Sequence, residues 1–132
     1  MQLIIFKDYN ALSQQAADEI IAVVKRKPDA VLCLASGSTP LLTCELLVQK
    51  AKAEDIDFSS CTFIGLDEWV GIPPGNEGSC AFFFRKHVLK HLNFSPSRIH
   101  LFNALSENLL RECAAMDRVI FENGGIDLML VG

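Results

Sequence analysis

The chain has 132 residues, of which half are apolar and 21% are charged. This length is typical of one domain, and the composition excludes an intrinsically disordered chain. The net charge of -4 and the pI near 5.3 argue against a nucleic-acid-binding surface. They leave room for an anionic ligand, because a phosphate site can be built locally from backbone N–H groups.

Targeting and redox features are sparse. The N-terminus carries no secretory signal pattern, and no apolar stretch reaches the length of a membrane span. The five cysteines are widely spaced and form no Cys-x-x-Cys pair, which favours reduced thiols over a disulfide framework or a zinc site. We therefore expect a cytoplasmic protein without membrane or nucleic-acid partners.

Two histidines raise the possibility of a metal site. His87 and His91 lie four residues apart on an expected helix and could provide two metal ligands. No third ligand lies nearby in the sequence. A solvated helix face is therefore favoured over a metal site, and we predict no metal.

The first half of the chain alternates between apolar runs and helical spacing. Residues 3–6 form a short apolar run that predicts a strand, and residues 11–27 repeat apolar positions at helical spacing. Residues 30–35 are apolar without polar alternation, as expected of a strand covered on both faces. Residues 36–39 form a turn, after which Pro40 opens a helix expected over residues 41–53.

The second half continues the alternation. We expect strands and helices in the order strand 61–66, loop 71–78, helix 81–91, strand 98–102, helix 106–122 and strand 126–131. Ser106 is the expected N-cap of the last helix, and Asn123-Gly124 its end. This order predicts a Rossmann-like, three-layer α/β/α fold with a mainly parallel sheet, in one domain over residues 1–132.

The sequence ends at Gly132, directly after the fifth expected strand. Ligand sites in open α/β sheets lie at the carboxyl ends of strands, so a loop of the site is expected at this point. We therefore expect a chain truncated after the fifth strand, at the point where a loop of the site begins.

The turn after the second expected strand has the composition of a phosphate site. Ser36-Gly37-Ser38-Thr39 leads into a helix N-terminus, whose unpaired N–H groups and partial positive charge favour an anion. Gly37 permits close approach of a ligand to the backbone. The run is neither a Walker A loop nor a Gly-x-Gly-x-x-Gly motif. The alternative is an ordinary turn with Thr39 as N-cap.

Two acids follow the next expected strand. Asp67 and Glu68 stand at its carboxyl end, beside the predicted phosphate turn. Successive side chains of a strand point to opposite sides, so the two acids should have different roles. One could enter the cleft as a proton-transfer base, and the other could pair with a structural partner. The alternative is an acid pair that caps the next helix or is simply solvated.

Taken together, these motifs resemble those of the glucosamine-6-phosphate isomerase/deaminase family. The resemblance rests on Ser36-Gly37-Ser38-Thr39-Pro40, on Leu66-Asp67-Glu68-Trp69-Val70-Gly71, on Gly78-Ser79 before an aromatic helix, and on Arg98-Ile99-His100. It covers essentially the whole chain and implies that residues 1–132 are the N-terminal half of a longer sugar-phosphate isomerase domain. The same superfamily includes 6-phosphogluconolactonases, whose acid motif tends to read Asp-Glu-Arg. Trp69 in place of that arginine favours the isomerase/deaminase branch.

The resemblance implies a function for each motif. Ser36, Gly37, Ser38 and Thr39 would hold the 6-phosphate of a phosphorylated hexose or hexosamine. Asp67 would be the proton-transfer base of an aldose–ketose isomerisation that ends in loss of ammonia, and Glu68 a positioning residue. No metal or organic cofactor would be needed, and a homo-oligomer is compatible with the family. The alternatives are a 6-phosphogluconolactonase-type hydrolase and a non-catalytic sugar-phosphate-binding fragment.

The chain also departs from the family's pattern. In the family, the fifth strand leads into a loop bearing Asp-x-His, and that histidine opens the sugar ring. Residues 128–132 match the lead-in to this loop, and none of the three histidines in the chain takes the family's position. We therefore expect the 132-residue chain to be inactive by itself.

Overall fold

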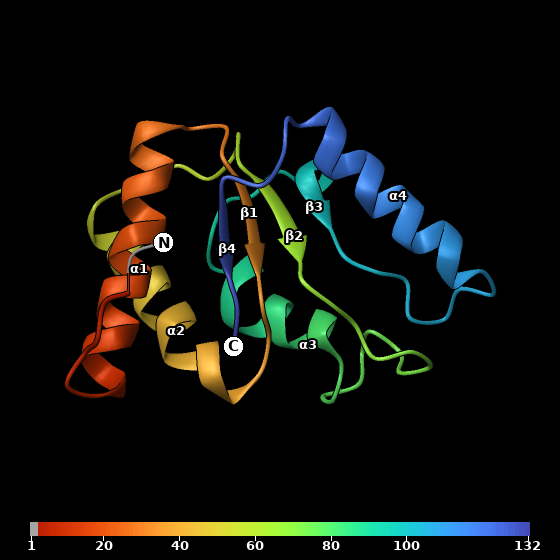
Figure 1. Ribbon diagram of the computed structural model, residues 1–132, viewed down its shortest axis with the longest axis horizontal. Helices are drawn as coiled ribbons and strands as arrows, with labels where there is room; N and C mark the ends of the chain where they lie inside the picture. Colours follow the sequence, from red (N-terminus) through yellow and green to blue (C-terminus); the bar gives the residue numbers. More distant parts are fainter. Residues whose placement is uncertain (1–2) are drawn as a thin grey trace.

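Helices and strands alternate along the computed structural model, which describes residues 3–132 (Figure 1). The elements are α1 (Tyr9–Arg26), β1 (Val31–Leu34), α2 (Ser38–Ala53), β2 (Thr62–Gly65), α3 (Cys80–Phe84), the π-helix η1 (Arg85–Leu89), the 3-10 helix η2 (Pro96–Arg98), β3 (Ile99–His100), α4 (Leu109–Glu122) and β4 (Leu128–Leu130). No helix in residues 3–132 is both long enough and apolar enough to cross a bilayer.

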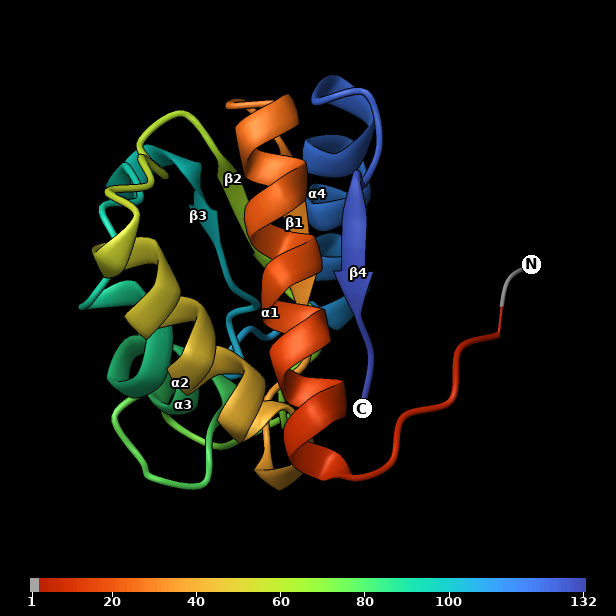
Figure 2. The ribbon, with the colours of Figure 1, turned by 90° about the vertical axis from the view of Figure 1, so that its left-hand side faces the viewer.

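The strands form one parallel sheet in the order β3-β2-β1-β4. Helices α1, α2 and α3 cover one face of this sheet, and α4 covers the other (Figures 1 and 2). The predicted three-layer α/β/α architecture with a parallel sheet is therefore confirmed. Strand β1 lies in the interior of the sheet and is buried over its whole length, as the unbroken apolar run predicted.

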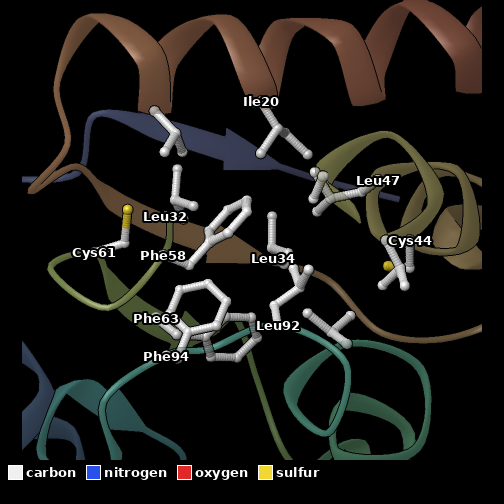
Figure 3. Close-up of a cluster of buried hydrophobic side chains, with 14 of the residues drawn as sticks. Ile20, Leu32, Leu34, Cys44, Leu47, Phe58, Cys61, Phe63, Leu92 and Phe94 are labelled. Atoms are coloured by element: carbon white, nitrogen blue, oxygen red, sulfur yellow. The ribbon is translucent and has the colours of Figure 1, made fainter. Parts of the chain in front are cut away.

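The larger core lies between the sheet and the three helices α1, α2 and α3 (Figure 3). Its centre contains Phe58, Phe63, Phe84 and Phe94, of which Phe63 contacts Phe84 and Phe94 edge to face, with ring centroids 5.1 and 5.4 Å apart. Such pairs add to the stabilisation from burial. A smaller cluster on the other face joins Val31, Cys33 and Ile64 to Met116 of α4, so alternate residues of β1 and β2 serve the two cores.

The prediction of a strand at residues 3–6 is wrong for this structure. The segment runs away from the body of the molecule (Figure 2), and the side chains of Leu3 and Ile5 are 82% and 85% exposed. A strand needs a neighbour to pair its N–H and C=O groups. No such neighbour lies beside residues 3–6 in the described part of the chain. The sheet accordingly has four strands and not the five expected.

Two helix starts also differ from the expected ones. Helix α2 begins at Ser38, before Pro40, because the backbone of Gly37 turns sharply at φ 111° and the first helical turn does not need the N–H that proline lacks. Helix α4 begins at Leu109, and its N-cap is Asn108, whose side chain accepts a hydrogen bond from the Arg111 N–H. Ser106, the expected cap, instead accepts a hydrogen bond from the Asn108 N–H.

The aromatic helix expected over residues 81–91 is a short α-helix that continues as a π-helix. Helix α3 ends at Phe84 and η1 follows directly, so the spacing of His87 and His91 is not that of a regular α-helix. In the π-helix each N–H bonds to the carbonyl five residues earlier, which makes the helical turn wider; the Lys90 N–H, for example, donates to the Arg85 carbonyl at 3.3 Å. Periodicity alone does not separate these two helix types.

Candidate active site

The carboxyl ends of three strands meet at one edge of the sheet. The N–H of Ala35 donates to the Leu130 carbonyl and the N–H of Leu66 donates to the Leu34 carbonyl, both at 2.9 Å. These bonds bring the segments that follow β1, β2 and β4 together. At the end of β4, a Cβ built on Gly132 would lie 3.7 Å from the Cβ of Thr39. The edge therefore holds both motifs singled out in the sequence.

The predicted phosphate turn lies between β1 and α2. Ser36 is half-buried, and Gly37, Ser38 and Thr39 are exposed. Gly37 is the N-cap of α2, with φ 111°, and no side chain caps this helix. The N–H groups of Ser38 and Thr39 therefore have no partner within the helix. They point out of a sixteen-residue helix, whose dipole favours an anion at this end.

Glu68 is bonded to the start of the next helix. Its Oε1 accepts hydrogen bonds from the N–H groups of Trp69 at 2.9 Å and of Cys80 at 2.8 Å, and its Oε2 accepts one from Ala81 at 2.8 Å. Three bonds to a single carboxylate fix its orientation. Glu68 thus connects the end of β2 to α3, across the Pro- and Gly-rich loop of residues 71–78.

Asp67 has a different environment. Its side chain is exposed, and its nearest polar partner is the buried Cys80 thiol, with Sγ 3.9 Å from Oδ1. Burial, and after it the negative charge of Asp67, raises the pKa of the Cys33 thiol. The two acids are therefore separated in role by their contacts: Glu68 is held by backbone donors, and Asp67 faces solvent beside two neutral thiols.

The Cys80 thiol lies between the two motifs. Burial is the main cause that raises its pKa; the neighbouring Ser36 hydroxyl opposes this shift, and the carboxylates of Glu68 and Asp67 add to it. The thiol is therefore neutral and can donate a weak hydrogen bond. Sequence analysis missed Cys80, because its contacts join segments far apart in the chain and follow no local pattern.

Gly65 brings the acids close to the core. A Cβ at this position would lie 2.8 Å from Leu101 Cδ2 and 3.1 Å from Phe84 Cε2. A side chain would therefore push the end of β2 away from α3. The absence of one lets the strand end, and with it Asp67 and Glu68, pack directly over the aromatic core.

An open cavity of about 290 Å³ borders the acids. Its walls include Asp67, Glu68, Val70, Asn103 and Leu109, so it lies between the end of β2 and the start of α4. A larger hollow of about 520 Å³ runs along β3 between Arg85 and Pro96 and touches neither motif. We place the candidate site at the smaller cavity, because it is the one that contains the strand-end carboxylates.

The three histidines lie elsewhere. His87 packs on Phe83 with ring centroids 4.8 Å apart, the His91 ring contacts the Lys86 carbonyl at 3.2 Å, and burial lowers the pKa of His100. None of them lines the cavity beside Asp67. No group of three or more His, Cys, Asp or Glu side chains in residues 3–132 has the arrangement of a metal site. All five cysteines are free.

Comparisons with known proteins identify relatives of this chain. The family model of glucosamine-6-phosphate isomerases/6-phosphogluconolactonase matches residues 7–132. A glucosamine-6-phosphate deaminase of Lachnoclostridium phytofermentans is 40% identical over 132 residues, which are all of this chain and 56% of the relative. One of Clostridium perfringens is 38% identical over the same span, 54% of its own length. The chain thus spans about half the length of the curated relatives that it matches.

Solved structures show the same relationship. A monomeric glucosamine-6-phosphate deaminase superposes with a TM-score of 0.92 at 31% identity, over 98% of this chain and 54% of the other. A 6-phosphogluconolactonase of Thermotoga maritima superposes with a TM-score of 0.74 at 16% identity, over 97% of this chain and 56% of the other, and shares the fold. The chain belongs to the family of glucosamine-6-phosphate isomerases and 6-phosphogluconolactonases, a family of enzymes.

Proposed function

We propose that this chain supplies the phosphate-binding and proton-transfer half of an amino-sugar-phosphate isomerase/deaminase. The reaction would convert glucosamine 6-phosphate and water to fructose 6-phosphate and ammonia. The observation that carries the proposal is the position of the Ser36–Thr39 turn, exposed at Gly37, Ser38 and Thr39, and of Asp67 at neighbouring strand ends of one sheet edge. The relatives at 38–40% identity that are named glucosamine-6-phosphate deaminase support it.

The turn would bind the phosphate group of the substrate. The free N–H groups of Ser38 and Thr39 would donate to its oxygens, and the hydroxyls of Ser36, Ser38 and Thr39 would add further donors. The space beside the Gly37 Cα is open, since no atom lies within 4 Å of a Cβ built there. A phosphate could therefore approach the backbone closely.

Asp67 would act at the other end of the sugar. As a carboxylate it would take the proton from C2 and return a proton to C1, while a proton passes from the C2 nitrogen to the C1 oxygen, which turns the 2-amino aldose into a ketimine. Water then adds to C2 and the nitrogen leaves as ammonia, which gives the ketose. The exposed side chain of Asp67 at the border of the cavity suits this role, because the carboxylate must reach substrate atoms.

Glu68 would position Asp67 and the loop that follows. Its three hydrogen bonds to the backbone of Trp69, Cys80 and Ala81 leave little freedom for it to move protons on a substrate. They fix the residue directly after Asp67 to α3. We therefore assign Glu68 a positioning role and Asp67 the catalytic one.

We further propose that residues 1–132 form the N-terminal half of a single domain and do not turn over substrate alone. The described residues place no histidine at the cavity beside Asp67. Removal of one general acid–base group typically lowers the rate about 100- to 10,000-fold. The isolated chain should therefore release ammonia from glucosamine 6-phosphate at least about 100-fold more slowly than the complete gene product.

The test is a product assay on the complete gene product. We expect stoichiometric ammonia and fructose 6-phosphate from glucosamine 6-phosphate, and no hydrolysis of 6-phosphogluconolactone. Lactone hydrolysis without ammonia would overturn the proposal in favour of the hydrolase branch. Binding of both sugars without turnover would overturn it in favour of a sugar-phosphate-binding protein.

A further inference from the structure

A tyrosine from α1 contacts the first turn of α2. The Tyr9 hydroxyl lies 2.8 Å from the Thr39 carbonyl oxygen and 3.2 Å from that of Ser38, and the Leu42 N–H lies 3.3 Å from the hydroxyl oxygen. Tyr9 is the first residue of α1, and about thirty residues separate it from these partners. One side chain thus joins the starts of two helices.

The geometry connects this hydroxyl to the proposed phosphate turn. The single hydroxyl proton is shared between the carbonyl oxygens of Thr39, the nearer one at 2.8 Å, and of Ser38 at 3.2 Å. The Ser38 carbonyl and the Thr39 N–H belong to one planar peptide unit, so a contact that holds this carbonyl also fixes the direction of the N–H. That N–H has no partner within the helix. A donor bonded to the carbonyl also polarises the peptide and makes its N–H a better donor.

Within residues 3–132, no other side chain is hydrogen-bonded to the start of α2 in the same way. Gly37, the N-cap, has no side chain, and Pro40 has no N–H with which to form a bond. We propose that Tyr9 is a positioning residue, which holds the Ser38–Thr39 peptide in the orientation that binds the phosphate of the substrate. This inference rests on the proposed function and extends the binding site to α1.

A second contact between α1 and α2 provides a matched control. Asp18 of α1 forms an ion pair with Lys50 of α2, far from the turn in the sequence. Asp18→Asn removes this ion pair between α1 and α2 without touching the Ser38–Thr39 peptide. A merely structural role for Tyr9 predicts similar behaviour of Tyr9→Phe and Asp18→Asn.

The experiment measures phosphate binding and turnover in the complete gene product. Titration with inorganic phosphate, followed by the amide NMR signals of residues 36–39, gives the Kd, and steady-state kinetics gives KM and kcat for glucosamine 6-phosphate. Tyr9→Phe removes the hydroxyl alone. We expect it to raise Kd and KM about 3- to 10-fold, the size of one lost hydrogen bond, with kcat within about twofold of the wild type. Asp18→Asn should leave Kd and KM unchanged.

The outcomes separate this inference from the proposed function. Equal phosphate affinity of Tyr9→Phe and the wild type, with shifts at residues 36–39 in both, would overturn the role of Tyr9 alone. Equal losses of affinity in Tyr9→Phe and Asp18→Asn would also overturn it, because the effect would then come from helix packing. A wild-type protein whose signals at residues 36–39 do not respond to phosphate would overturn the phosphate site and the inference together.

Discussion

The two faces of the sheet are covered to different extents. Under α1, α2 and α3 the core is closed, and α1 alone buries six residues. Under α4 only Met116 of that helix is buried, while Leu110 and Phe121 of the same helix are each 84% exposed. The phosphate turn leads into α2, which packs on the closed face, whereas the cavity beside Asp67 borders the open face. The proposed phosphate turn and the cavity beside Asp67 thus border faces of the sheet that are covered to different extents.

The largest effect should come from the centre of the closed face. Phe63→Ala removes a fully buried ring that contacts both Phe84 and Phe94. We expect a loss of about 3–5 kcal/mol in the free energy of unfolding, measured by urea denaturation. Phe121→Ala on the open face should change it by less than about 0.5 kcal/mol. Equal losses in the two variants would contradict the difference between the faces.

Glu68→Gln should come next in size. The amide puts an NH₂ group opposite backbone N–H donors, so at least one of the three bonds to Trp69, Cys80 and Ala81 is lost. We expect a loss of about 1–3 kcal/mol in unfolding free energy and faster hydrogen exchange at the Cys80 and Ala81 amides. Glu77→Gln, in the exposed loop nearby, is the control and should have no effect. Unchanged amide exchange in Glu68→Gln would show that the carboxylate does not hold α3.

A smaller, pH-dependent effect is expected where β1 and β4 begin. The Lys27 ammonium, and next the Val31 N–H, lower the pKa of Asp127 below its ordinary value of 3.8. A lowered folded-state pKa means that the stabilisation is complete above the unfolded pKa and disappears as the pH falls through the folded one. Asp127→Asn should therefore lower stability by about 0.5–1.5 kcal/mol at pH 7, a modest value because both groups are partly exposed.

The difference between Asp127→Asn and the wild type should shrink as the pH falls below 3.8 and vanish once the pH has passed below the lowered folded-state pKa of Asp127. Thermal unfolding at a series of pH values measures it. A difference that stays constant as the pH falls from 7 to well below 3.8 would mean that the charge of Asp127 contributes nothing.

The smallest effect is expected at the N-terminus. Ile5→Ser alters a side chain that is 85% exposed, so the Tm of the 132-residue chain should not change measurably. Leu32→Ala, in an apolar run of similar composition, should lower unfolding free energy by about 2–5 kcal/mol, because Leu32 is fully buried. A large effect of Ile5→Ser would show that residues 3–6 pack in solution.

These two apolar runs mark how far sequence alone predicts the fold. Composition predicts a strand both for residues 3–6 and for the run that contains residues 31–34. Only residues 31–34 pair with neighbouring strands, β2 on one side and β4 on the other. Strand formation depends on a partner elsewhere in the chain, which periodicity in one segment does not reveal. The alternating order of elements, in contrast, sufficed for the parallel sheet, because parallel strands need crossover connections.

The same limit applies to the site. The grouping of the Ser36–Thr39 turn with Asp67 and Glu68 at one edge was predictable, since parallel strands end at the same side of a sheet. The contacts of Cys80 with Asp67, and of Tyr9 with Thr39, join distant segments and appear only in three dimensions. Gly65 is similar, because its lack of a side chain matters only once Phe84 is seen against it.

The proposed division of roles between the two acids has one direct test. Asp67→Asn in the complete gene product keeps the size and hydrogen-bonding capacity of the side chain but removes its basicity, so kcat with glucosamine 6-phosphate should fall about 100- to 10,000-fold while KM changes little. Glu68→Gln should lower kcat far less. An Asp67→Asn enzyme of nearly full activity, beside an inactive but folded Glu68→Gln enzyme, would contradict the account.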